Sequence, residues 1–245
     1  MNGVCRSIVR GGIPTIARRL VLLFKYPWEG DGCLVREKLG VCFRMKTRES
    51  GMPPESMWRE FFQPSTMLQL LGLDPSCQNV LEFGCGYGTF TIPAATMIEG
   101  SVYAIDIDPE MLAITQAKLD ATSLRNVTLI QRDFVTQGTG LPSGSMDYVM
   151  LFNILHAEER TAILREAYRV LGEGGKLAIV HWNYDASTPR GPSMPIRPRS
   201  GDCRKWAEDV GFVSMSPNEI TLPPYHYGWV LQRPARSENE SLRIP

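Results

Sequence analysis

Three glycines at alternate positions form the clearest chemical signal in the chain. The stretch VLEFGCGYGTF contains Gly84, Gly86 and Gly88, and Glu82 precedes them. Glycines let backbone N–H groups approach a ligand closely, and the start of a helix favours negative charge. The turn therefore predicts a ligand site, with a purely structural tight turn as the alternative.

Carboxylates follow the same turn along the chain. Asp106 ends the apolar run SVYAIDI, 18 residues after Gly88, and Asp133 ends the run VTLIQRD. At that spacing a carboxylate can accept hydrogen bonds from both hydroxyls of a ribose. Glu82 lies inside a strand-like run, where a carboxylate needs a buried partner. The residue types thus predict a nucleoside site.

A parallel sheet is the element that would bring these residues together. From Asn79 onward, short apolar or β-branched runs alternate with helical patterns, which is typical of a parallel sheet covered on both faces. The carboxyl ends of such strands form a ligand-binding edge. We expect strands at residues 79–85, 101–107, 127–133, 146–155 and 176–182.

The helices between these strands have readable ends. Asp108 and Pro109 predict an N-cap and a first-turn proline for a helix through Leu119. Glu158 and Glu159 favour the positive end of a later helix, which Gly172 can stop. The apolar face of that later helix is Leu164, Ala167, Tyr168 and Leu171.

The two flanks of this pattern differ from it. After residue 182 a proline- and arginine-rich stretch precedes a helix at 202–210 and strand-like runs at 211–216 and 223–232, which predict a C-terminal antiparallel hairpin. Upstream, residues 53–73 predict two short helices broken at Pro64. This segment carries Trp58, and we expect it to cover a pocket, with a sheet edge as the alternative.

The first 44 residues have a different composition, with eight Lys and Arg against three Asp and Glu. The apolar run at 20–24 is too short for a bilayer span or a secretory signal. A mis-started leader, a disordered extension and a targeting peptide all fit this segment. We expect an extension at 1–44, a helical lid segment at 45–78, the main domain at 79–235 and a flexible tail at 236–245.

The composition of the chain indicates which classes of binding partner are not favoured. The 245 residues carry 26 basic and 26 acidic side chains, so the overall charge does not favour nucleic acid or a membrane surface. The six cysteines form no CxxC pair and have no histidine at metal spacing, which argues against a metal site. A reducing compartment fits, and we expect a cytoplasmic monomer or homodimer without a membrane span.

Five motifs taken in order resemble those of class I S-adenosylmethionine-dependent methyltransferases. They are LEFGCGYGTF, VYAIDIDPEML, RDF, DYVMLFNILH and LGEGGKLAIV, and the resemblance covers roughly residues 79–232. The C-terminal half is more loosely similar to small-molecule methyltransferases of the quinone-biosynthesis type. The resemblance implies a Rossmann-like, doubly wound, mostly parallel sheet of seven strands with the antiparallel hairpin, and S-adenosylmethionine as cofactor.

The resemblance also assigns roles to individual residues. Glu82 would meet the amino group of the cofactor, and Asp106 would accept from both ribose hydroxyls. Asp133 would meet the adenine amine. The remaining cofactor-binding residues that it implies are Gly84, Cys85, Gly86, Tyr87 and Gly88 in the turn, Ile107 and Phe134 beside the adenine, and Asn153 after the fourth strand.

Each of these roles has a structural alternative. Cys85 reads as a small buried residue and not as a nucleophile, and Asp108 reads as a helix cap. Asn153 could brace a turn, and Asp133 could only end its strand. The run Tyr225 to Tyr227 fits either a pocket rim or the core.

Methyl transfer chiefly requires alignment of the reactants and exclusion of water. A base is needed only when the acceptor arrives protonated, and the candidate catalytic residues are His181, His156 and Asn153, with a structural role open for both histidines. Arginines 190, 197 and 199 would suit an anionic substrate.

We therefore expect a methyltransferase that acts on a small-molecule acceptor. A nicotinamide-dependent oxidoreductase is one alternative, although its third glycine would be misplaced here. A non-catalytic protein that binds S-adenosylmethionine is the other.

Overall fold

The glycine turn belongs to a sheet of the expected α/β class. The computed structural model describes residues 53–235 of the chain. The predictions for the extension at 1–44 and the tail at 236–245 lie outside the described residues, as do residues 45–52 of the predicted lid segment.

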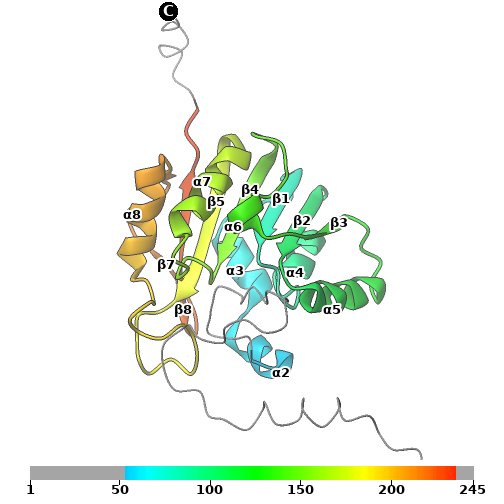
Figure 1. Ribbon diagram of the computed structural model, residues 1–245, viewed down its shortest axis with the longest axis horizontal. Coiled ribbons are helices and arrows are strands. Elements are labelled where there is room, and N and C mark those ends of the chain that lie inside the picture. Colours follow the sequence, from blue (N-terminus) through cyan, green and yellow to red (C-terminus); the bar gives the residue numbers. More distant parts are fainter. Residues whose placement is uncertain (1–52, 236–245) are drawn as a thin grey trace, which may run out of the picture. The chain divides into compact units, whose positions relative to one another are not determined.

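The sheet has the order β3-β2-β1-β4-β5-β8-β6, and β7 pairs with β8 (Figure 1). The first five strands are parallel, and β8 is antiparallel to β5, β6 and β7. This confirms a mostly parallel sheet with an antiparallel C-terminal part. The strands are β1 (Asn79–Phe83), β2 (Ser101–Asp106), β3 (Val127–Gln131), β4 (Met146–Phe152), β5 (Leu171–Trp182), β6 (Val213–Ser214), β7 (Ile220–Leu222) and β8 (His226–Gln232).

The prediction of seven strands was wrong, because the described residues form eight. The additional strand is β7, which has only three residues and is followed closely by Pro223 and Pro224. So short a run shows no alternation of apolar and polar residues from which a strand could be predicted. It is held in place by pairing with the longer strand β8.

Helices cover both faces of the sheet, because successive residues of each buried strand point to opposite sides. Val80 and Tyr148 pack with α3 and α4 on one face, whereas Leu81 and Val149 pack with α7 and α8 on the other. The helices are α2 (Glu55–Trp58), the 3₁₀ turn η2 (Arg59–Phe61), α3 (Pro64–Leu70), α4 (Thr91–Met97), α5 (Pro109–Asp120), α6 (Phe134–Gln137), α7 (Arg160–Val170) and α8 (Ser200–Val210). The two short upstream helices and their break before Pro64 are thus as predicted.

Helix α5 begins where the sequence predicted. The Asp108 side chain accepts a hydrogen bond from the backbone N–H of Glu110 at 3.0 Å, and Pro109 occupies the first helical position. Asp108 is therefore an N-cap, which satisfies one of the free N–H groups at the start of the helix.

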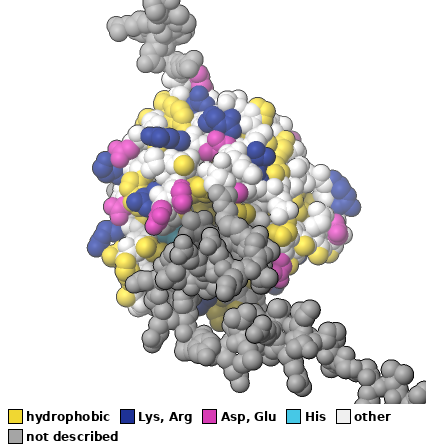
Figure 2. All heavy atoms as spheres, viewed as in Figure 1, with side chains coloured by type: hydrophobic (Ala, Val, Ile, Leu, Met, Phe, Trp, Pro, Cys, Tyr) yellow, Lys and Arg dark blue, Asp and Glu magenta, His cyan; other side chains and the backbone are white. Residues whose placement is uncertain are grey.

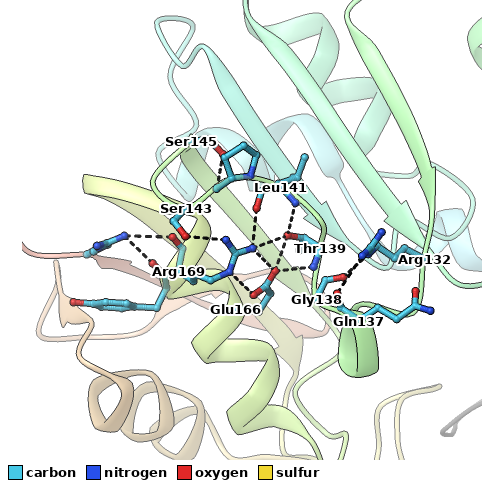
Figure 3. A network of polar contacts seen from close by, with 12 residues as sticks. Arg132, Gln137, Gly138, Thr139, Leu141, Ser143, Ser145, Glu166 and Arg169 are labelled. Atoms are coloured by element: carbon cyan, nitrogen blue, oxygen red, sulfur yellow. Dashed lines mark hydrogen bonds and ion pairs between the residues drawn. The ribbon is translucent and has the colours of Figure 1, made fainter.

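A polar network fixes α7 against the loop that precedes β4 (Figure 3). Glu166 Oε1 accepts from the backbone N–H and the hydroxyl of Thr139 at 2.6 and 2.7 Å, and Arg169 donates to Glu166 and to the carbonyl of Leu141. The hydrogen bond from Arg169 lowers the pKa of Glu166 to about 2. The network therefore anchors the second half of α7, whose first turn lies at the edge where β4 ends.

Candidate functional site

The described residues enclose a cavity of about 340 Å³ at the carboxyl ends of the parallel strands. β1 lies between β2 and β4, and the chain continues toward β3 on one side and toward β5 on the other. This is the point at which the strand order reverses, where open α/β sheets bind their ligands. The volume is in the range of small-molecule sites.

The glycine turn forms one wall of this cavity. Gly84 and Gly86 have φ values of 73° and 51°, which residues with a side chain rarely adopt. The backbone N–H of Gly84 donates to the carbonyl of Ile105 at 2.8 Å, so the turn is tied to the end of β2. Both glycines line the cavity, together with Cys85. Burial raises the pKa of the Cys85 thiol, which agrees with a buried structural cysteine.

Asp106 connects the end of β2 to this turn. One carboxylate oxygen accepts from the backbone N–H of Gly86 at 2.9 Å, and the other accepts from the N–H of Asp108 at 2.9 Å. The side chain is 9% exposed and lines the cavity. The structure therefore brings Asp106 to the glycine turn, as the motif spacing predicted.

Gly88 serves a different purpose from the other two glycines. A Cβ atom at this position would lie 2.7 Å from Thr115 Cγ2, and φ is 70°. Gly88 is not among the residues that line the cavity. The Thr115 hydroxyl donates to the carbonyl of Gly86 at 3.0 Å. The third glycine thus lets α5 approach the turn, and our expectation that it faces a ligand is not met.

Glu82 is buried in β1 and reaches the cavity wall. Its Oε2 accepts a hydrogen bond from the Thr91 hydroxyl at 2.5 Å. Burial raises the pKa of Glu82 to about 8, and the hydrogen bond from Thr91 only partly opposes this. The buried partner that the sequence required is therefore Thr91, in the first position of α4.

Asp133 and its neighbours lie at the other end of the cavity. The Asp133 carboxylate accepts from the backbone N–H groups of Val135 and Thr136, so it caps α6. It also lines the cavity, as do Ile107 and Phe134. Ile107 is 45% exposed, which leaves an apolar surface at this end for a ligand.

Asn153 and His156 lie in the loop after β4 and line the cavity. Asn153 has a φ of 57°, an uncommon conformation for a residue with a side chain. Its Oδ1 is buried and has no hydrogen-bond partner within residues 53–235. Such strain together with an unsatisfied oxygen is typical of ligand-binding positions.

His181 lies beneath the cavity and not in its wall. The backbone N–H of Trp182 donates to His181 Nδ1 at 3.0 Å, and the His181 ring meets the His156 ring edge-on at 5.6 Å. Burial lowers the pKa of His181 well below its ordinary value. The nitrogen that could accept a proton is thus already occupied, which disfavours His181 as a base.

Two segments far apart in sequence complete the cavity wall. Pro53 and Trp58 come from the upstream helical segment, and residues 190–192 come from the proline-rich stretch after β5. Tyr87 is not among the lining residues, and its hydroxyl donates to the carbonyl of Pro53 at 3.1 Å. Tyr87 therefore holds the upstream segment, and its role beside the cofactor stays a prediction.

Several lining residues were not predicted as site residues, among them Phe152, Trp182 and Glu159. Phe152 and Trp182 end β4 and β5, so their position at strand ends was a usable signal. Glu159 was interpreted only as a favourable charge at the start of a helix. Nothing in the sequence distinguishes it from its neighbour Glu158.

Comparison with known proteins shows what this chain resembles. Residues 80–175 match the model of a methyltransferase domain. A demethylmenaquinone methyltransferase from Listeria welshimeri is 35% identical over 117 residues, which cover 46% of this chain and 47% of that protein. The aklanonic acid methyltransferase DauC from a Streptomyces species is 30% identical over 133 residues, 53% of this chain and 60% of that protein.

The chain spans about half the length of the curated relatives it matches. Among solved structures, a SAM-dependent methyltransferase from Aquifex aeolicus superposes with a TM-score of 0.65 at 23% identity, over 75% of this chain and 100% of that one. At this identity the likeness is evidence of the fold.

Proposed function

We propose that this chain is a class I S-adenosylmethionine-dependent methyltransferase and that it transfers a methyl group from S-adenosylmethionine to a small-molecule acceptor. One observation carries the proposal. A single cavity reaches from Asp106 and the glycine turn to the aromatic side chains of Phe152 and Trp182. A nucleoside and an apolar acceptor can therefore meet in it.

The residues of the turn fit the cofactor. The bends at Gly84 and Gly86 keep side chains away from the cavity at two positions, and the Asp106 carboxylate beside them is an acceptor suited to a ribose diol. Asn153 Oδ1 is a buried acceptor that suits the amino group of a methionine portion. The remaining proposed cofactor-binding residues are Glu82, Cys85, Ile107, Asp133 and Phe134.

The acceptor would occupy the other half of the cavity. Trp58, Phe152 and Trp182 supply aromatic surfaces there, and His156 and Arg190 supply polar groups. Such walls suit a compact, largely apolar ring compound.

The chain would contribute alignment and shielding. When bound, the cofactor supplies a methyl group activated by a positively charged sulfur. The walls from residues 53–58 and 190–192 keep water from the reacting atoms. His156 stays a candidate catalytic residue because it lines the cavity, whereas His181 would position His156 by ring contact.

We also propose the partners and the compartment of the protein. The visible face in Figure 2 shows basic and acidic side chains interspersed, which gives nucleic acid no continuous basic track. Cys77, Cys85 and Cys203 are free thiols, which suits the cytoplasm. No helix in residues 53–235 is long and apolar enough to cross a membrane. Size-exclusion chromatography would test the proposed monomer or homodimer.

Calorimetry with three nucleosides tests the proposed function. We expect S-adenosylmethionine and S-adenosylhomocysteine to bind, and NAD to give no heat. Incubation with labelled S-adenosylmethionine and panels of small molecules, tRNA and protein should label only small molecules. Binding of NAD alone would contradict the proposal. Cofactor binding without transfer to any panel would favour a non-catalytic binding protein instead.

A further inference from the structure

Two adjacent glutamates at the start of α7 have opposite surroundings. Glu158 is exposed, whereas Glu159 lines the cavity. Glu159 Oε2 is fully buried and has no hydrogen-bond partner in the described part of the chain. A buried carboxylate oxygen without a partner is costly, which points to a ligand group that donates a hydrogen bond to it.

The backbone explains why this carboxylate faces the cavity. Glu159 is the N-cap residue of α7, and its carbonyl accepts from the N–H groups of Ala162 and Ile163 at 2.8 and 3.1 Å. Its side chain makes no capping hydrogen bond. The carboxylate is therefore not used to stabilise the helix, although an acidic side chain at this position commonly is.

No neighbouring cation satisfies Glu159 either. The next residue, Arg160, places its guanidinium 4.4 Å from the centre of the Trp206 ring and donates to the carbonyl of Ala157 at 3.1 Å. No ion pair joins Arg160 to Glu159 within residues 53–235. The partner of the carboxylate must then come from a ligand.

A ligand that satisfies Glu159 must be an aromatic compound that carries a hydrogen-bond donor. A carboxylate oxygen can only accept, and the same cavity is lined by the aromatic side chains of Phe152, Trp182 and Trp58. Building on the proposed function, we propose that Glu159 Oε2 binds the hydroxyl of an aromatic acceptor and takes up its proton during methyl transfer.

The step balances without a further reactant. The O–H bond of the acceptor breaks and its proton passes to Glu159. The electron pair left on the hydroxyl oxygen forms the new bond to the methyl carbon, and the pair of the broken carbon–sulfur bond stays on sulfur. The product is a neutral aryl ether, and the proton leaves the carboxylic acid of Glu159 for water once the cavity opens.

2-Naphthol and its methyl ether, 2-methoxynaphthalene, are matched probes, because they differ only in the donor. Their affinities for the full chain would be measured with S-adenosylhomocysteine present, and formation of the ether from 2-naphthol would be followed with S-adenosylmethionine. The variants are Glu159→Gln, which keeps the shape but cannot take up a proton, and Glu158→Gln as the exposed control.

We expect the wild-type chain to prefer 2-naphthol over the ether by about tenfold or more, as for a hydrogen bond to a charged group. Glu159→Gln should lose most of this preference and form the ether roughly a hundredfold more slowly, the usual contribution of a general base. Its affinity for S-adenosylhomocysteine should not change. Glu158→Gln should behave like the wild type in all three measurements.

Several outcomes would overturn the assignment. They are an equal affinity for the two probes, no binding of 2-naphthol, no formation of the ether by the wild type, or full activity in Glu159→Gln. The proposed function fails separately, because its failure would show as no binding of S-adenosylhomocysteine to the wild-type chain or as no methyl transfer to any compound in the panels.

Discussion

The ammonium group of Lys118 lies 2.5 Å from the Glu55 carboxylate, although 63 residues separate them in the chain. Lys118 belongs to α5 and also donates to the carbonyl of Tyr87 at 2.6 Å. Glu55 begins α2, the helix that brings Trp58 to the cavity. One cation thus joins the upstream segment to the glycine turn.

Removing this ion pair should loosen α2 without unfolding the domain. We expect Glu55→Gln to accelerate hydrogen exchange of the amides at 55–61. The global free energy of unfolding should fall by less than about 1 kcal/mol, because both side chains are partly exposed. Glu60→Gln is the control, since Glu60 is exposed on the same segment. Equal exchange in both variants would show that the pair does not hold α2.

Substitutions of the two aspartates near the end of β2 should have different effects, one on ligand affinity and the other on stability. Asp106→Asn should lower the affinity for S-adenosylhomocysteine by roughly ten- to a hundredfold, because a charged acceptor is lost. Asp108→Ala should destabilise the fold by about 1 kcal/mol through loss of the helix cap, with affinity retained. Calorimetry and denaturant unfolding give the two quantities. Unchanged affinity in Asp106→Asn would show that Asp106 does not bind the ribose.

Glu82 should make the unliganded protein less stable as pH rises. Its pKa is raised from 4.5 to about 8 by burial, so the folded state holds a proton that the unfolded state releases above pH 4.5. The stabilisation is complete below pH 4.5 and is lost as pH rises toward 8, by at most a few kcal/mol.

The matching variant is Glu82→Gln, which mimics the protonated side chain. Its free energy of unfolding should depend less on pH between 5 and 8 than that of the wild type. Glu99→Gln is the exposed control and should keep the wild-type slope. If the free energy of unfolding changed with pH equally in Glu82→Gln and the wild type, Glu82 would not be the cause of the pH dependence.

Arg197 should keep the loop at residues 184–192 ordered. Residues 190–192 of this loop line the cavity. The buried guanidinium of Arg197 donates to the Thr188 hydroxyl at 2.6 Å and to the carbonyls of Asn183, Asp185, Arg190 and Pro192. A lysine cannot reproduce this fork of donors. We expect Arg197→Lys to cost about 2–3 kcal/mol and to accelerate amide exchange at 184–192, with cofactor affinity retained. Arg165→Lys, at an exposed position on α7, should leave that exchange unchanged.

Gly88 and Thr115 should behave as a coupled pair. Gly88→Ala should be destabilising, by roughly 1–2 kcal/mol for the left-handed backbone and a further 1–3 kcal/mol for the contact with Thr115 Cγ2. Thr115→Ser removes that methyl group and keeps the hydroxyl bonded to Gly86. The double variant should recover part of the loss, which a double-mutant cycle measures. Additive losses would contradict the contact.

The parts of the site that could be predicted from the sequence are those whose position depends only on residues nearby in the chain. Asp106 follows an apolar strand and precedes a capped helix, so its place at the carboxyl edge follows from neighbouring residues alone. The same holds for Gly84 and Gly86. The position of Asn153 at the end of β4 could be predicted in this way too, because the strand ends before it.

The remaining features depend on contacts between distant segments. Gly88 is required by Thr115, which lies one helix later, and no local pattern reveals that contact. The orientation of His181 depends on the N–H of Trp182 and on the packing of β8, so its type and position alone suggested a base. Glu158 and Glu159 differ only in which one the first turn of α7 directs inward.

The walls of the cavity come from segments far apart in the described chain, from Pro53 to Pro192. The unfolded chain cannot bring these segments together, so a compound that fills the cavity binds the folded form alone. At a concentration of 100 times its Kd such a compound adds about 2.7 kcal/mol to the free energy of unfolding. A thermal-shift screen of hydroxylated ring compounds, with S-adenosylhomocysteine present throughout, would therefore reveal the acceptor by its effect on Tm, before any product has been detected.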